Sequence, residues 1–162
     1  MRFAIAIAIA LFAAFPAFAQ SDENLLKGAK SYQAIYFVNA RGKCEYREED
    51  AKKAFSGMIK GAPLKEANTP ANDIFVWITV TVLDVSDRPD RLSCVYDISF
   101  DVKTNFYKIT LPYNGKSISA DAPIFQEGTI GFLQQGDLTK KLDGRIKAYT
   151  GQFLKKFYLE NQ

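Results

Sequence analysis

The sequence predicts an α+β domain in which an antiparallel meander of four to five strands packs with N-terminal helices and a C-terminal helix. Two observations lead to this class. Between residues 74 and 102, apolar side chains recur at every second position, as they do in strands. Outside that region, at 25–36, 51–59 and 138–157, they recur at every third or fourth position, as in amphipathic helices. Helices that flank an unbroken run of strands are typical of α+β folds.

Residues 1–19 have the pattern of a cleaved secretory signal peptide. A positively charged start precedes an apolar run over residues 3–15, and Ala17-Phe18-Ala19 offers the small residues at which signal peptidase cuts. We therefore expect cleavage near Ala19–Gln20, a single mature domain of residues 20–162, and a location in the periplasm or outside the cell. A retained membrane anchor is the alternative, but a span needs about 20 apolar residues and this run is shorter.

A first helix is expected to begin at Ser21, because serine is a good N-cap and two acids follow it. Its apolar stripe is Leu25, Ala29, Tyr32 and Tyr36. Residues 34–38 are mostly aromatic or β-branched and would serve equally well as a strand. The sequence therefore leaves residues 32–39 open between helix and strand.

A second helix is predicted from Glu48, because three consecutive acids suit the positive N-terminal end of a helix. Its apolar positions are Ala51, Ala54, Phe55, Met58 and Ile59. Gly61 and Pro63 are expected to end it. Residues 62–73 then read as a surface crossing.

The first strand is predicted to start at Ile74 and to sit centrally in the sheet, because it is apolar on both faces as far as Asp84. The second strand, 92–102, alternates apolar with polar residues, which predicts one buried and one wet face.

Three further strands complete the expected meander. The third runs over Phe106–Tyr113 and leads into Asn114-Gly115, a strong signal for a two-residue hairpin, so that a fourth begins near Lys116. Pro112 suggests that this pair lies at an edge. Residues 124–133 predict a fifth strand, weakened by its two glycines.

The closing helix follows the hairpins, with Asp137 as its expected N-cap. Its apolar stripe is Leu138, Leu142, Ile146, Tyr149, Phe153 and Phe157. This stripe must pack on the sheet or on the other helices.

Cys44 and Cys94 are the only cysteines of the chain, and in an exported protein they are expected to form a disulfide. The bridge would close a loop of about 51 residues, which contributes roughly 4 kcal/mol in the chain-entropy model. Cys94 falls on the buried face of its strand, so the bridge would fasten the second helix to the sheet. Two reduced, buried thiols are the alternative.

Histidine is absent from the chain, which removes most hydrolytic chemistry. Serine triads need an imidazole, and zinc enzymes usually draw a ligand from one. Asp97 and Asp101 point the same way, but residues four apart on a strand lie about 13 Å apart, beyond the spacing of glycosidase carboxylates. Asp84, Asp87 and Asp90 lack the spacing of a calcium hand. The sequence predicts no catalytic residue, cofactor or metal.

The charge of the chain favours no nucleic-acid partner, because the formal net charge is only +3. The closing helix nevertheless carries a set of cations that we call the lysine face. It consists of Lys140, Lys141, Lys147, Lys155 and Lys156. Such a face can meet an acidic partner or the anionic headgroups of a membrane surface, although most such faces are simply hydrated.

By elimination, the sequence predicts an exported, non-catalytic binding or accessory protein whose partner is another protein, contacted through a sheet edge or a helix surface. One alternative is a carrier of an apolar small ligand or lipid. Its pocket would be lined by Tyr96, Phe100, Tyr107 and Phe153, whose spacing equally fits an ordinary core. A carboxylate-based hydrolase is a further alternative. The sequence does not indicate the partner or the oligomeric state.

Overall fold

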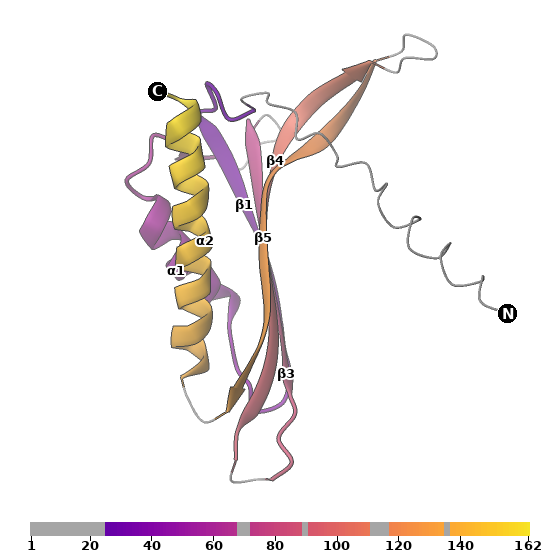
Figure 1. Cartoon of the computed structure of the whole chain (residues 1–162), viewed down its shortest axis with the longest axis vertical. Helices are drawn as coiled ribbons and strands as arrows, with labels where there is room; N and C mark the ends of the chain where they lie inside the picture. The colour runs from indigo at the N-terminus through magenta and orange to yellow at the C-terminus, as the bar shows by residue number, and fades with distance from the viewer. Residues whose placement is uncertain (1–24, 68–71, 89–90, 111–116, 135–136) are drawn as a thin grey trace, which may run out of the picture.

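The computed structural model describes residues 25–67, 72–88, 91–110, 117–134 and 137–162, with the backbone alone at 105–110 and 117–122. The expected signal peptide, its cleavage point, the cap at Ser21 and the turn at 111–116 lie outside the described residues. The described chain forms one five-stranded sheet in the order β2-β1-β3-β4-β5, with two helices packed on it (Figure 1).

The sheet is mixed, so the predicted purely antiparallel meander is wrong in part. The elements are β1 (Ser31–Ala40), α1 (Glu48–Ile59), β2 (Lys65–Glu66), β3 (Ile74–Asp84), β4 (Ser93–Thr110), β5 (Ser117–Gln134) and α2 (Leu138–Glu160). Only β3, β4 and β5 form an antiparallel meander, whereas β1 runs parallel to both β2 and β3. The parallel connection from β1 to β3 passes through α1, as such crossovers usually do.

The expected first helix is absent from the described residues, because residues 25–28 form a turn and β1 follows. Gly28, with φ of 80°, belongs to this turn. Aromatic and β-branched side chains occupy β1, which pairs with β3 from Tyr32 opposite Ile74 to Ala40 opposite Val82. These side chains fit a pleated surface better than a helix, so the strand alternative for residues 32–39 is confirmed.

The four strands expected between residues 92 and 133 are two long strands. β4 continues through the polar residues 103–105, which separate the second and third expected strands, and its register with β5 shifts there. β3 has its first pairing at Ile74 opposite Thr104, and beyond this point β4 and β5 pair only with each other in the described chain. Figure 1 shows this hairpin arm bending away from the rest of the sheet.

The core lies between one face of the sheet and the two helices. Phe55 of α1, Phe100 of β4 and Phe153 of α2 are fully buried, with ring centroids 6.1 Å apart for Phe55 and Phe100 and 6.4 Å apart for Phe100 and Phe153. Both helices begin where the sequence predicts. The Asp137 cap is confirmed, because its Oδ1 accepts a hydrogen bond from the Lys140 amide at 2.9 Å.

The predicted disulfide is confirmed. Cys44, in the loop before α1, is bonded to Cys94 at the start of β4, and their Cα atoms lie 6.0 Å apart. Close by, the hydroxyl of Tyr46 donates a hydrogen bond to Asp143 of α2 at 2.8 Å. The loop is therefore fixed both to the sheet and to the closing helix.

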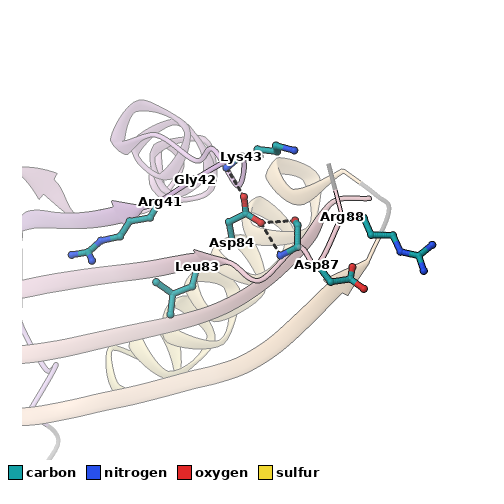
Figure 2. A pocket seen from close by; sticks show the side chains of 8 residues that line it. Arg41, Gly42, Lys43, Leu83, Asp84, Asp87 and Arg88 are labelled. Carbon is teal, nitrogen blue, oxygen red and sulfur yellow. Dashed lines mark hydrogen bonds between the residues drawn. The ribbon is translucent and has the colours of Figure 1, made fainter. Parts of the chain in front are cut away.

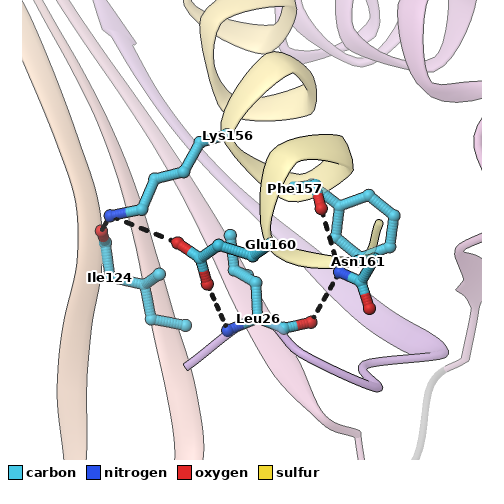
Figure 3. Close-up of polar contacts among 6 residues, drawn as sticks. All are labelled: Leu26, Ile124, Lys156, Phe157, Glu160 and Asn161. Atoms are coloured by element: carbon cyan, nitrogen blue, oxygen red, sulfur yellow. Dashed lines mark hydrogen bonds and ion pairs between the residues drawn. The ribbon is translucent and has the colours of Figure 1, made fainter. Parts of the chain in front are cut away.

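The end of α2 holds the turn that precedes β1 (Figure 3). Glu160 accepts a hydrogen bond from the Leu26 amide at 2.9 Å. Asn161 accepts one from the Gly28 amide at 2.8 Å and donates to the Leu26 carbonyl at 2.9 Å. The buried side chain of Leu26 is thereby secured at the edge of the core.

Candidate functional site

The face of the sheet that points away from the helices is the main candidate site. Figure 1 shows α1 and α2 on the same side, so no described helix covers the other side, which we call the open face. Its side chains come from the odd positions of 33–39, 75–83 and 95–103, and from the even positions of 126–134. The large apolar residues on it fall into two patches.

The aromatic patch consists of Ile35, Phe37, Phe75 and Trp77 on β1 and β3. Phe37 is 52% exposed and its ring stacks on Trp77, with centroids 5.6 Å apart and planes 15° apart. The ammonium group of Lys103 lies 5.5 Å from the centre of the Trp77 ring, within the range of a cation–π contact. Trp77 Nε1 is buried and has no hydrogen-bond partner among the described residues.

The edge patch consists of Leu83, Val95, Ile130 and Phe132, at the opposite corner of the open face. Leu83 pairs with Val95, and Val95 pairs with Phe132 across the three strands. Leu83 is 43%, Ile130 is 79% and Phe132 is 57% exposed. Side chains of this size are buried in most folded domains, so a group of them on one face is typical of a contact surface.

Small and polar side chains separate the two patches. Thr79, Ser99 and Gly128 form one row across the sheet. Asp101 accepts hydrogen bonds from Ser99 at 3.2 Å and from the amide of Gln126 at 3.1 Å. Asp97 is exposed one row away. The middle of the open face therefore has small side chains with two carboxylates beside them, which suits a partner that brings a cation.

Asp84, one of the three acids considered as a calcium loop, is the last residue of β3 and stands at the start of the loop that follows (Figure 2). Asp84 accepts hydrogen bonds from the hydroxyl and amide of Ser86 and from the amide of Lys43. These bonds, led by the Ser86 hydroxyl, lower the pKa of Asp84 to about 2. Asp90 lies outside the described residues, among which no group of three ligands is placed to hold a metal ion. Asp84 thus orders the loop.

The structure divides the predicted lysine face. Lys140, Lys141, Lys147 and Lys155 are exposed. Lys156 instead donates a hydrogen bond to the Ile124 carbonyl at 2.8 Å and lies 3.8 Å from Glu160 (Figure 3). The described helices include none that is long and apolar enough to cross a membrane.

A groove runs between the start of α2 and the end of β5. It has a volume of about 590 Å³ and is lined by Leu133, Asp137, Lys140, Lys141, Gly144, Arg145 and Ala148. Three of these side chains are cationic and one is anionic. The groove therefore favours a carboxylate that enters beside Leu133.

The residues expected to line a ligand pocket are part of the core. Tyr96, Phe100 and Phe153 are almost completely buried and belong to the same cluster as Phe55 and Phe157. Tyr107 lies among the residues whose side chains are not described. Tyr96, Phe100 and Phe153 therefore fill the interior of the domain, which is the ordinary core that their spacing equally fitted.

Sequence reasoning missed the open face. Phe75, Trp77 and Leu83 were interpreted as the second buried face of a central strand, and β3 is indeed central in the sheet. An apolar pattern does not say on which side of the sheet the helices pack.

No family model and no curated protein matches this chain. Among solved structures, a dodecamer of a PelC variant from Paraburkholderia phytofirmans has a TM-score of 0.40 and 9% identity, over 80% of this chain and 86% of that one. A minor lipoprotein from Acinetobacter baumannii has a TM-score of 0.36 and 7% identity, over 79% and 91%. Hypothetical protein CT253 from Chlamydia trachomatis has a TM-score of 0.39 and 10% identity, over 75% and 98%. Similarities of this size assign neither a family nor a function to this chain.

Proposed function

We propose that this chain is an exported, non-catalytic protein that binds another protein through the open face of its sheet. The observation that carries the proposal is the exposure of Phe37, Leu83, Ile130 and Phe132 on a face that no described element covers. Exposed apolar groups of this kind lose unfavourable contact with water when a partner covers them. The disulfide supports the exported location, because such bonds persist in oxidising compartments.

The open face also indicates the chemistry of the partner. Its two apolar patches call for apolar side chains on the partner, spaced to reach both corners of the sheet. Between them, Asp97 calls for a lysine or arginine. Phe37, whose ring stacks on Trp77, offers an exposed aromatic surface for an apolar side chain of the partner. A folded protein surface supplies all of these groups.

The test is photo-crosslinking from single positions in cells that export the protein. A benzoylphenylalanine replaces Phe37 in one variant and Lys147 in a matched control, both on exposed positions of regular elements. We expect a discrete crosslinked protein from position 37, and loss of that protein from affinity capture in a Phe37→Asp variant. Crosslinking from position 147 alone would assign the contact to the lysine face and overturn the proposal. Absence of any crosslink at position 37 would do the same.

A further inference from the structure

The two edges of the sheet differ in how they are protected against pairing. At the other edge, β2 consists of Lys65 and Glu66, both charged and exposed, and Pro63 precedes them. β2 pairs only with Ser31 and Tyr32, and the rest of β1 pairs with β3 alone in the described chain. Short length, charge and proline are the devices by which proteins block edge pairing. The β5 edge between Gln126 and Gln134 has a single charge, Glu127, and neither proline nor lysine. In the described chain, no strand pairs with that side of β5.

We propose that β5 pairs antiparallel with β5 of a second copy of this chain, about a two-fold axis at Ile130. The contact goes beyond the proposed function, because it assigns Ile130 and Phe132 of the edge patch to a second copy of this chain and leaves Phe37 and the rest of the aromatic patch for the other protein. Two separate observations support a second copy as the occupant: the pattern of side chains along the strand and the charge of the groove beside it.

On the open face, the sequence of β5 is complementary to itself about Ile130. In this register, a residue that lies a given number of positions before Ile130 pairs with the residue that lies the same number of positions after Ile130 in the second copy. Ile130 therefore meets Ile130 of the second copy, which covers a side chain that is 79% exposed. Phe132 meets Gly128, where the missing side chain leaves room for the ring, and Gln126 meets Gln134, where two amides can bond to each other.

On the helix-covered face, the same register produces a match of charge. Glu127 stands opposite Leu133 of the second copy, and Leu133 lines the groove that contains Lys140, Lys141 and Arg145. The one acid of the free edge is thereby directed toward the cations of the neighbouring molecule. Symmetry repeats this contact, so two such pairs flank the axis.

The first experiment measures association of the mature, oxidised protein by sedimentation equilibrium without any other protein present. We expect a dimer that the Ile130→Lys substitution converts to a monomer, because it brings two cations together at the axis. Phe37→Lys is the matched control, an exposed aromatic on the same face but away from β5, and should leave the dimer intact. A wild-type monomer at the highest soluble concentration overturns the proposal. Dissociation by Phe37→Lys in place of Ile130→Lys also overturns it, in favour of face-to-face stacking.

The second experiment tests the register. Residues directly opposite have Cβ atoms about 4.5 to 5.5 Å apart, so Ile130→Cys should give a disulfide-linked dimer under mild oxidation. Phe132→Cys should not, because the two copies of residue 132 are offset by four positions, about 13 Å. The reverse result would refute pairing about Ile130.

Charge reversal tests the groove. Glu127→Lys should weaken dimerisation by about tenfold or more, since two like-charge contacts arise. Adding Lys140→Glu and Lys141→Glu to it should restore association. If the combined variant remains monomeric while its circular dichroism is unchanged, the register proposed here is wrong. These assays use purified protein only, whereas the crosslinking from Phe37 needs the other protein. The proposed dimer can therefore fail its tests while the proposed protein partner is found, or the reverse.

Discussion

Asp84 shows how a single carboxylate orders the loop that leads out of β3. Its oxygens accept hydrogen bonds from Ser86 and from the Lys43 amide, and the adjoining Gly42 has φ of 74°. A Cβ at Gly42 would lie 2.5 Å from the Asp84 Cβ, so the close approach of the two loops requires glycine. These contacts position the chain just before Cys44.

The lowered pKa of Asp84 predicts a specific dependence of stability on pH. Its pKa falls from 3.8 to about 2 on folding, chiefly through the Ser86 hydroxyl, so the ionised form favours the folded state. The stabilisation is present above about pH 4 and disappears as the pH falls toward 2. We therefore expect Asp84→Asn to lower the free energy of unfolding at pH 7.

Urea denaturation at a series of pH values checks this expectation. The difference between wild type and Asp84→Asn should shrink below about pH 4 and vanish near pH 2. Asp87→Asn, in the loop that follows, serves as the control for removing one negative charge nearby. If the difference in free energy of unfolding stays constant across the pH range, the hydrogen bonds of Asp84 stabilise the fold independently of its charge.

The elements show which parts of the fold could be predicted from the sequence. The helices at 48–59 and 138–157 were predictable because their apolar stripes agree with the core that they meet, and because acids begin the first helix and Asp137 caps the second. β1 was ambiguous because residues 25, 29, 32 and 36 happen to follow helical spacing, while the pairing with β3 decides the outcome. Nothing in a period-two pattern distinguishes a parallel from an antiparallel neighbour.

The long hairpin of β4 and β5 was missed for a different reason. The polar residues near Lys103 look like the end of a strand, yet here they lie where the register of β4 and β5 shifts and the chain continues. The edge patch of the candidate site was missed together with this hairpin. The exposure of Ile130 and Phe132 depends on β5 being the edge and on both helices packing on the other face, and both are properties of tertiary structure.

The disulfide gives a prediction at the level of elements, because it joins the loop before α1 to the start of β4. Replacing Cys44 and Cys94 together by alanine should lower the free energy of unfolding by about 2 to 4 kcal/mol. Urea denaturation measures the change.

The bridge itself is tested by thiol labelling. Unfolded, unreduced wild-type protein should contain no thiol that a labelling reagent can reach. Labelling at both positions would contradict the bridge, and unchanged stability would contradict its role.

At the scale of the whole molecule, the two ends of the described chain are tied together by Glu160 and Asn161. Asn161→Ala removes the acceptor of the Gly28 amide but leaves Glu160 to hold the Leu26 amide. We therefore expect hydrogen exchange at Gly28 to become much faster, while Leu26 stays largely protected. Exchange measured by nuclear magnetic resonance separates the two amides. Equal loss of protection at both would mean that the whole turn detaches from α2.

The single β5 edge has a consequence for how large an assembly this protein can form through that strand. In the language of polymer chemistry, a molecule that can react at one end only is monofunctional, and a solution of such molecules stops growing at pairs. Once two copies join through β5, neither copy has a β5 edge left, and the charged Lys65–Glu66 strand lies at each outer border of the combined sheet. Association through β5 therefore ends at the dimer and does not build fibrils.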